Sequence, residues 1–185
     1  MGRMGLPVPP GFTISTKVCE IFYKDKKKLN SKLISQIKKE IKTIEKDVSK
    51  KFGDLKNPLL LSVRSGARVS MPGMMDTILN LGLNDKTVVA LANKTSNGRF
   101  AKDSYRRFIQ MYGNVVMGVE SYNFEELIEN YKLTKGVLLD TDLDEEDWDG
   151  LINDFKNVVK EKTNKDFPQD VYHQLFGAIS AVFLS

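Results

Sequence analysis

The chain has 185 residues, and its 41% of hydrophobic and 28% of charged side chains exclude an intrinsically disordered chain. A single cysteine, Cys19, excludes an intrachain disulfide framework and a cysteine-rich zinc site, and a single histidine, His173, leaves no material for a multi-histidine metal site. The formal net charge of +4 hides a basic front, net +8 over residues 1–56 and +5 over residues 57–119, and an acidic rear, net −9 over residues 120–170.

No apolar run reaches the roughly 18 residues that a membrane-spanning helix needs, and the start of the chain lacks the apolar core of a signal peptide. The single cysteine also fits a reducing compartment. We therefore expect a soluble chain with a cytoplasmic location and no membrane partner.

A short strand and a helix are the first elements that the sequence predicts. Residues 12–14 follow a proline-rich opening, which favours extended backbone, and are a strand candidate. Ser15 or Thr16 can then cap a helix over residues 18–22.

A second helix has the clearest pattern in the chain. Its apolar residues recur at steps of three and four and share one face: Leu33, Ile37, Ile41, Ile44 and Val48. Ser31 can cap its start and Gly53 follows its end. The lysines on its other faces suggest a nucleic-acid or membrane surface, but Glu40, Glu45 and Asp47 are interspersed and no aromatic residues interleave. A solvated helix face is the better interpretation, so we expect no nucleic-acid partner.

The middle of the chain holds the predicted strands. Residues 59–63 form an apolar run after Pro58 and are a buried-strand candidate. A segment of small residues with two arginines follows over residues 64–73, and residues 77–83 are either a strand or a short helix.

From Asn84 onward the pattern is helical. Helices are expected over residues 86–93, 99–117, 124–131 and 143–162, and from Pro168 to residue 182. The alternating acids of residues 140–151 resemble a calcium loop, but the positions that need glycine and glutamate hold Glu145 and Leu151. Asp142 or Asp144 is better interpreted as a helix cap.

Residues 62–76 suggest a phosphate site. A buried strand that runs into small residues brings backbone N–H groups close to a phosphate, and arginine adds bidentate recognition of phosphoryl oxygens. This is no Walker loop, because Gly66 and Gly73 are seven residues apart and no Gly-Lys-Ser/Thr follows. A tight turn with solvated arginines is the alternative.

Residues 62–85, SVRSGARVSMPGMMDTILNLGLND, resemble the signature of the pyruvate, phosphate dikinase family. Three further blocks support the resemblance in the family's order and spacing: LPVPPGFTI at residues 6–14, DSYRRFIQMY at residues 103–112 and GAISAVF at residues 177–183. The resemblance covers essentially the whole chain.

The resemblance implies an α+β, predominantly helical fold, namely part of an ATP-grasp nucleotide-binding domain with an inserted all-helical subdomain. We expect residues 1–83 to form part of the nucleotide-binding subdomain and residues 84–167 to form the helical subdomain. Residues 168–185 would then be a helix that returns to the nucleotide-binding subdomain.

The resemblance also implies an ATP site. Arg64 resembles the family's phosphate-contacting arginine at a strand end, and Arg107 resembles a second one. The loop that would cover the phosphates and adenosine contributes Arg68, Ser70, Met71, Gly73 and Met75. The family uses ATP, phosphate and Mg²⁺ to phosphorylate a histidine, which passes the phosphoryl group to pyruvate and gives phosphoenolpyruvate, AMP and pyrophosphate.

Several parts of the family's pattern have no counterpart in the sequence. A Gly-Gly-Lys-Gly segment, the acidic metal ligands, the phosphohistidine domain and the pyruvate domain are missing, so we expect a fragment without catalytic residues or metal ligands that is inactive alone. The missing domains are its expected partners. The alternative is a stand-alone, non-catalytic module that pairs with or regulates a complementary chain. The uncharged helix over residues 171–184 predicts self-association through an exposed apolar face.

Overall fold

Helices dominate residues 8–66 and 77–185, the part of the chain that the computed structural model describes. The α-helices in this part are α1 (Thr16–Lys24), α2 (Ser31–Val48), α3 (Thr87–Thr95), α4 (Gly98–Val115), α5 (Ser121–Lys135), α6 (Glu145–Thr163) and α7 (Val171–Leu184). The strands are β1 (Lys51–Phe52), β2 (Pro58–Leu59), β3 (Leu61–Val63) and β4 (Ile78–Leu81). The expected α+β, predominantly helical class is therefore confirmed.

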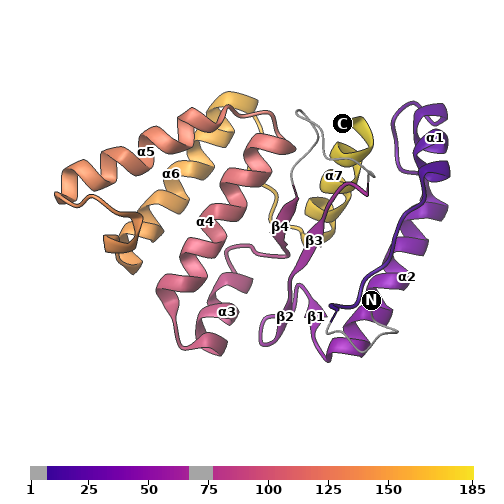
Figure 1. Cartoon of the computed structure of the whole chain (residues 1–185), viewed down its shortest axis with the longest axis horizontal. Coiled ribbons are helices and arrows are strands. Elements are labelled where there is room, and N and C mark those ends of the chain that lie inside the picture. The colour runs from indigo at the N-terminus through magenta and orange to yellow at the C-terminus, as the bar shows by residue number, and fades with distance from the viewer. Residues whose placement is uncertain (1–7, 67–76) are drawn as a thin grey trace.

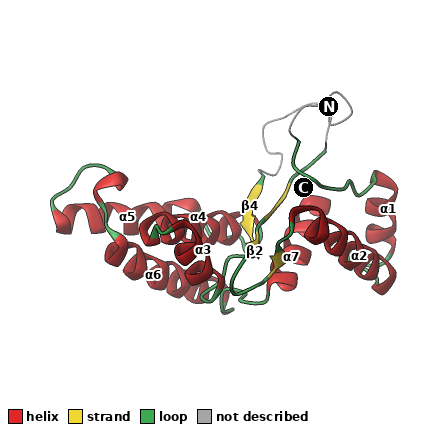
Figure 2. Cartoon of the chain, turned by 90° about the horizontal axis from the view of Figure 1, so that it is seen from below, coloured by secondary structure: helices red, strands yellow, loops and turns green. Residues whose placement is uncertain are grey.

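The strands lie between two groups of helices. On one side are α3 to α6, and on the other are α1, α2 and α7 (Figures 1 and 2). Helix α4 packs against α3, α5, α6 and β4, while α7 packs against β3 and β4. Strand β4 is thus covered by helices from both groups.

The predicted strand over residues 59–63 is present in two pieces. Strand β2 pairs in parallel with β1, whereas β3 pairs antiparallel with β4 in a separate sheet. Leu60 separates the two strands. Residues 77–83 contain strand β4 and no helix, because pairing with β3 satisfies its backbone groups. The predicted strand over residues 12–14 is wrong: these residues are loop, and no strand of residues 8–66 and 77–185 pairs with them.

The buried face of α2 is confirmed, but its predicted ends are not. Leu33, Ile37 and Ile41 are buried, as their spacing requires. The side-chain oxygen of Asn30, and not that of Ser31, caps the start by accepting a hydrogen bond from the Leu33 nitrogen at 2.9 Å. At the other end the helix stops at Ser49, which adopts a left-handed conformation with φ 53°.

Two of the later helix starts also differ from expectation. Helix α5 begins at Ser121, so Asn123 lies in its first turn. Helix α7 begins after Asp170, whose side chain accepts a hydrogen bond from the His173 nitrogen, and Pro168 precedes it. The predicted cap of α6 is confirmed, because the Asp144 carboxylate accepts hydrogen bonds from the nitrogens of Glu146 and Asp147.

The two chain segments that join α3–α6 to the strands lie side by side. The Asp85 carboxylate accepts a hydrogen bond from the Tyr105 hydroxyl at 2.9 Å, and that hydroxyl accepts one from the Gln169 side-chain nitrogen at 3.1 Å. The Phe167 ring is packed edge-on against the rings of Phe108 and Tyr112, each with a centroid distance of 5.6 Å. Residues 84–85 and 167–169 are therefore held together on α4.

Candidate functional site

Arg64 is the first residue after β3, at the strand end where the sequence predicts a phosphate-contacting arginine. It is exposed. The backbone before it is held in place by the pairing of Val63 with Ile78 on β4. The pairing of β3 with β4 therefore fixes the backbone position at which Arg64 begins, while the Arg64 side chain is exposed to solvent.

The loop that the sequence assigns to the phosphates lies largely outside the described residues. The structure describes its two ends, Gly66 and Thr77, and not the residues between them. The predicted contacts that fall in that interval are Arg68, Ser70, Met71, Gly73 and Met75, and they stay predictions.

Arg107 lies on α4 with its side chain 61% exposed. Its Nε donates a hydrogen bond to an Asp103 carboxylate oxygen at 3.0 Å, one helical turn earlier. Among the residues that the structure describes, its two terminal nitrogens have no hydrogen-bond partner. A guanidinium that is held at Nε keeps the terminal nitrogens available for a bidentate contact with a phosphoryl group.

The neighbouring Arg106 has a different environment. Its side chain is 6% exposed, and it donates to the second Asp103 oxygen at 2.5 Å. Its guanidinium carbon lies 4.7 Å from the centroid of the Trp148 ring, a cation–π contact. Burial lowers the pKa of Arg106, and the negative charge of Asp103 opposes this shift. Arg106 is therefore part of the packing between α4 and α6, and Asp103 orients both arginines.

The helix that carries Arg107 is fixed to the strand beside Arg64. The Leu79 nitrogen donates to the Met111 sulfur at 3.2 Å, and Met111 lies one turn after Arg107 on α4. Arg64 thus follows β3 and Arg107 lies on α4, and both β3 and α4 contact β4.

His173 and Cys19, which the sequence also offers as reactive side chains, have ordinary structural positions. His173 is exposed on α7, and the Cys19 sulfur donates to the Phe183 carbonyl at 3.7 Å. The described residues contain no group of three His, Cys, Asp or Glu side chains that can hold a metal ion. No helix in residues 8–66 and 77–185 is long and apolar enough to cross a membrane.

Comparison with known proteins finds similarity to one enzyme family. Residues 26–112 match the family described as "Pyruvate phosphate dikinase, AMP/ATP-binding domain". The chain is 51% identical over its whole length to pyruvate, phosphate dikinase of Entamoeba histolytica and 53% identical to that of Clostridium symbiosum, and covers 21% of each. Over 99% of its length it is 52% identical to the chloroplastic enzyme of Flaveria pringlei, of which it covers 19%. The chain thus spans about a fifth of the length of these relatives.

Proposed function

We propose that this chain, which matches part of pyruvate, phosphate dikinase over its whole length and an AMP/ATP-binding domain over residues 26–112, supplies phosphate-contacting arginines to the ATP site of such an enzyme. The observation that carries the proposal is the position of Arg64: an exposed guanidinium directly after a paired strand, at the start of the segment that resembles the family signature.

The proposed reaction converts ATP, phosphate and pyruvate to AMP, pyrophosphate and phosphoenolpyruvate through a phosphohistidine on another domain. Phosphoryl transfer depends on positioning and on neutralisation of the charge that develops on the phosphoryl oxygens. In this proposal Arg64, which follows β3, and Arg107, on α4, supply that neutralisation. The phosphohistidine and pyruvate domains are the proposed partners of this chain.

Within this proposal, residues 1–83 belong to the strand-bearing nucleotide-binding subdomain of an ATP-grasp fold and residues 84–167 to an inserted helical subdomain. The mutual packing of α3 to α6 supports the second assignment. The return of α7 onto β3 and β4 supports the placement of residues 168–185 with the strands.

Magnesium enters the proposal only with the nucleotide. We infer that Mg²⁺ reaches the site as MgATP, because Mg²⁺ in nucleotide sites is held largely by the substrate phosphates and by one or two carboxylates. We also propose a cytoplasmic location. The name of the Clostridium relative states no organelle, whereas the name of the Flaveria relative states the chloroplast.

Calorimetric titration of the 185-residue chain with ATP, with and without Mg²⁺, tests the proposal. We expect saturable binding, and the variant Arg64→Ala weakens it about tenfold because a charge-assisted hydrogen bond to phosphate is lost. Lys42→Ala removes one positive charge from the exposed surface of α2 and is the matched control. Unchanged affinity in Arg64→Ala would overturn the assignment of Arg64.

We also propose that the isolated chain has no dikinase turnover. Pyruvate-dependent formation of AMP by the purified 185-residue chain would contradict this. If the folded chain binds no ATP by itself, the result favours the alternative of a module that works only with a complementary chain.

A further inference from the structure

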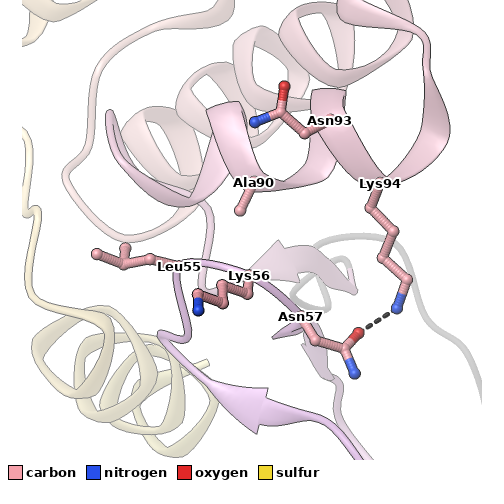
Figure 3. A pocket seen from close by; sticks show the side chains of 6 residues that line it. All are labelled: Leu55, Lys56, Asn57, Ala90, Asn93 and Lys94. Atoms are coloured by element: carbon pink, nitrogen blue, oxygen red, sulfur yellow. Dashed lines mark hydrogen bonds between the residues drawn. The ribbon is translucent and has the colours of Figure 1, made fainter.

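A pocket of about 440 Å³ lies between the turn that follows β1 and helix α3 (Figure 3). It is separate from the arginine pair described above. Its lining residues come from two parts of the chain that face one another: Leu55, Lys56 and Asn57 from the turn, and Ala90, Asn93 and Lys94 from the helix. The volume is that of a site for a small molecule.

The charge of the pocket lining is positive. Two lysines, Lys56 and Lys94, and two asparagines are its polar lining residues, and no Asp or Glu is among the lining residues. The nearest acid in the turn, Asp54, directs one oxygen to the backbone nitrogens of Lys56 and Asn57 at 2.7 Å each. These backbone hydrogen bonds lower the pKa of Asp54. Its carboxylate is thus engaged within the turn and does not line the pocket.

One wall of the pocket is held rigidly by Asn57. Its side-chain nitrogen donates to the Ser49 carbonyl at 2.8 Å, and its backbone nitrogen donates to Asp54 at 2.7 Å. Its side-chain oxygen accepts a hydrogen bond from the Lys94 ammonium, as Figure 3 shows. The Lys94 head group is therefore positioned in the absence of a ligand, and an ammonium group has two further N–H donors.

The pocket also has an apolar part. Ala90 is 4% exposed, whereas Leu55 is 59% exposed and stands at the edge of the pocket. An organic group that covered Leu55 would remove apolar surface from water and gain binding free energy.

We propose that this pocket binds a small organic phosphate. The phosphate group lies between Lys56 and Lys94 and accepts a hydrogen bond from the Asn93 carboxamide, while the organic group covers Leu55 beside the buried Ala90. Such a ligand contacts the turn and α3 at once. Because α3 packs against β2 and α4, the bound ligand strengthens the attachment of α3 to the strand-bearing part of the chain.

NMR titration of the ¹⁵N-labelled 185-residue chain tests the proposal, with inorganic phosphate and phenyl phosphate as probes at constant ionic strength. We expect saturable shifts of the Asn57 and Asn93 side-chain amides and of the Ala90 backbone amide. Phenyl phosphate binds more tightly than inorganic phosphate because its ring covers the apolar part of the pocket.

The variant Lys94→Gln weakens phenyl phosphate binding about tenfold, since a charge-assisted hydrogen bond is lost. Lys86→Gln is the matched control, because Lys86 is an exposed lysine at the start of the same helix and does not line the pocket. Lys56→Gln is a second variant on the opposite wall. The amide spectrum of each variant shows whether the fold is intact.

Three results would overturn the proposal: no saturable shift, equal affinity in Lys94→Gln and Lys86→Gln, or shifts confined to the residues around Arg64. The variant Arg64→Ala should keep the pocket's affinity for phenyl phosphate. Failure of this pocket to bind would thus leave the ATP proposal unaffected, and failure of ATP binding would leave the pocket unaffected.

Discussion

The side-chain oxygen of Gln174 lies 3.0 Å from the backbone nitrogen of Gly82 and accepts its hydrogen bond. The side-chain nitrogen of Gln174 donates to the carbonyls of Leu83 at 2.9 Å and Pro168 at 2.8 Å. Gln174 is fully buried. One side chain on α7 therefore satisfies three backbone groups and fixes this helix to the end of β4, the strand that pairs with β3 before Arg64.

Replacement of Gln174 by leucine should destabilise the chain by about 2–4 kcal/mol, because it leaves buried backbone groups without partners. Urea unfolding followed by circular dichroism measures the change. His173→Ala, at an exposed neighbouring position, is the control and should stay within about 0.5 kcal/mol of the wild type. A Gln174→Leu protein as stable as this control would show that the three hydrogen bonds contribute nothing net.

Gly82→Ala should destabilise the chain more than Gly118→Ala. Both glycines have positive φ, +106° and +75°, so both substitutions strain the backbone. Only at Gly82 does an added Cβ meet neighbours, at 2.8 Å from the Phe52 ring and 3.0 Å from the Leu59 carbonyl oxygen. Thermal unfolding of the two variants measures the loss of stability in each. Both variants share the backbone strain, so the difference between them reports the clash at Gly82. Equal losses of stability would contradict a close approach at Gly82.

The two adjacent arginines of α4 should differ in what they do. Arg106→Ala costs about 3 kcal/mol of stability, because it removes one partner of a buried ion pair. Arg107→Ala changes stability by about 0.5 kcal/mol or less, since its ion pair is exposed, but under the proposed function it weakens ATP binding. Urea unfolding and ATP calorimetry on the same two proteins check this, and a stable Arg106→Ala protein together with an unchanged ATP affinity in Arg107→Ala would contradict both assignments.

The cap of α6 gives stability a pH dependence. The pKa of Asp144 is lowered from 3.8 to about 2. The largest cause is the hydrogen bond from Lys135, and the backbone nitrogens of Asp147 and Glu146 contribute further hydrogen bonds. Because the folded state favours the ionised carboxylate, this stabilisation is complete above the unfolded pKa and is lost as the pH falls through the folded one.

Asp144→Asn keeps a capping oxygen but removes the charge. It should therefore be less stable than the wild type at neutral pH, and the gap should close as the pH approaches about 2. Urea midpoints of the two proteins across this range measure the gap. A gap that stays constant down to the lowest pH would show that the charge of Asp144 is not its source.

Periodicity predicted the helices well and their ends poorly. The spacing of Leu33, Ile37 and Ile41 places them on one face, and burial of that face follows from the hydrophobic effect. Asn30 and Ser31 are both residue types that cap helices well, so the sequence does not decide between them. The backbone geometry of the folded chain selects Asn30. The break at Leu60 depends on two partner strands that lie elsewhere in the chain, which a local pattern does not contain.

The candidate site was predictable in part. A strand followed by Arg64 is visible in the sequence, and the structure has it at that position. The difference between Arg106 and Arg107 was missed, although it has a sequence signal. Arg107 lies opposite the helix face that carries Tyr105 and Ile109, whereas Arg106 lies beside that face and within reach of Trp148.

The most direct test of the central claim uses a complete pyruvate, phosphate dikinase that contains this segment and carries Arg64→Ala. The two half-reactions are measured separately: phosphorylation of the enzyme by ATP and phosphate, and phosphoryl exchange between the enzyme and pyruvate. If Arg64 contacts the phosphates of ATP, the first falls by about 100-fold or more, as for loss of a charge-stabilising donor, and the second is unchanged. Equal losses in both half-reactions, or no loss in the first, would contradict the claim.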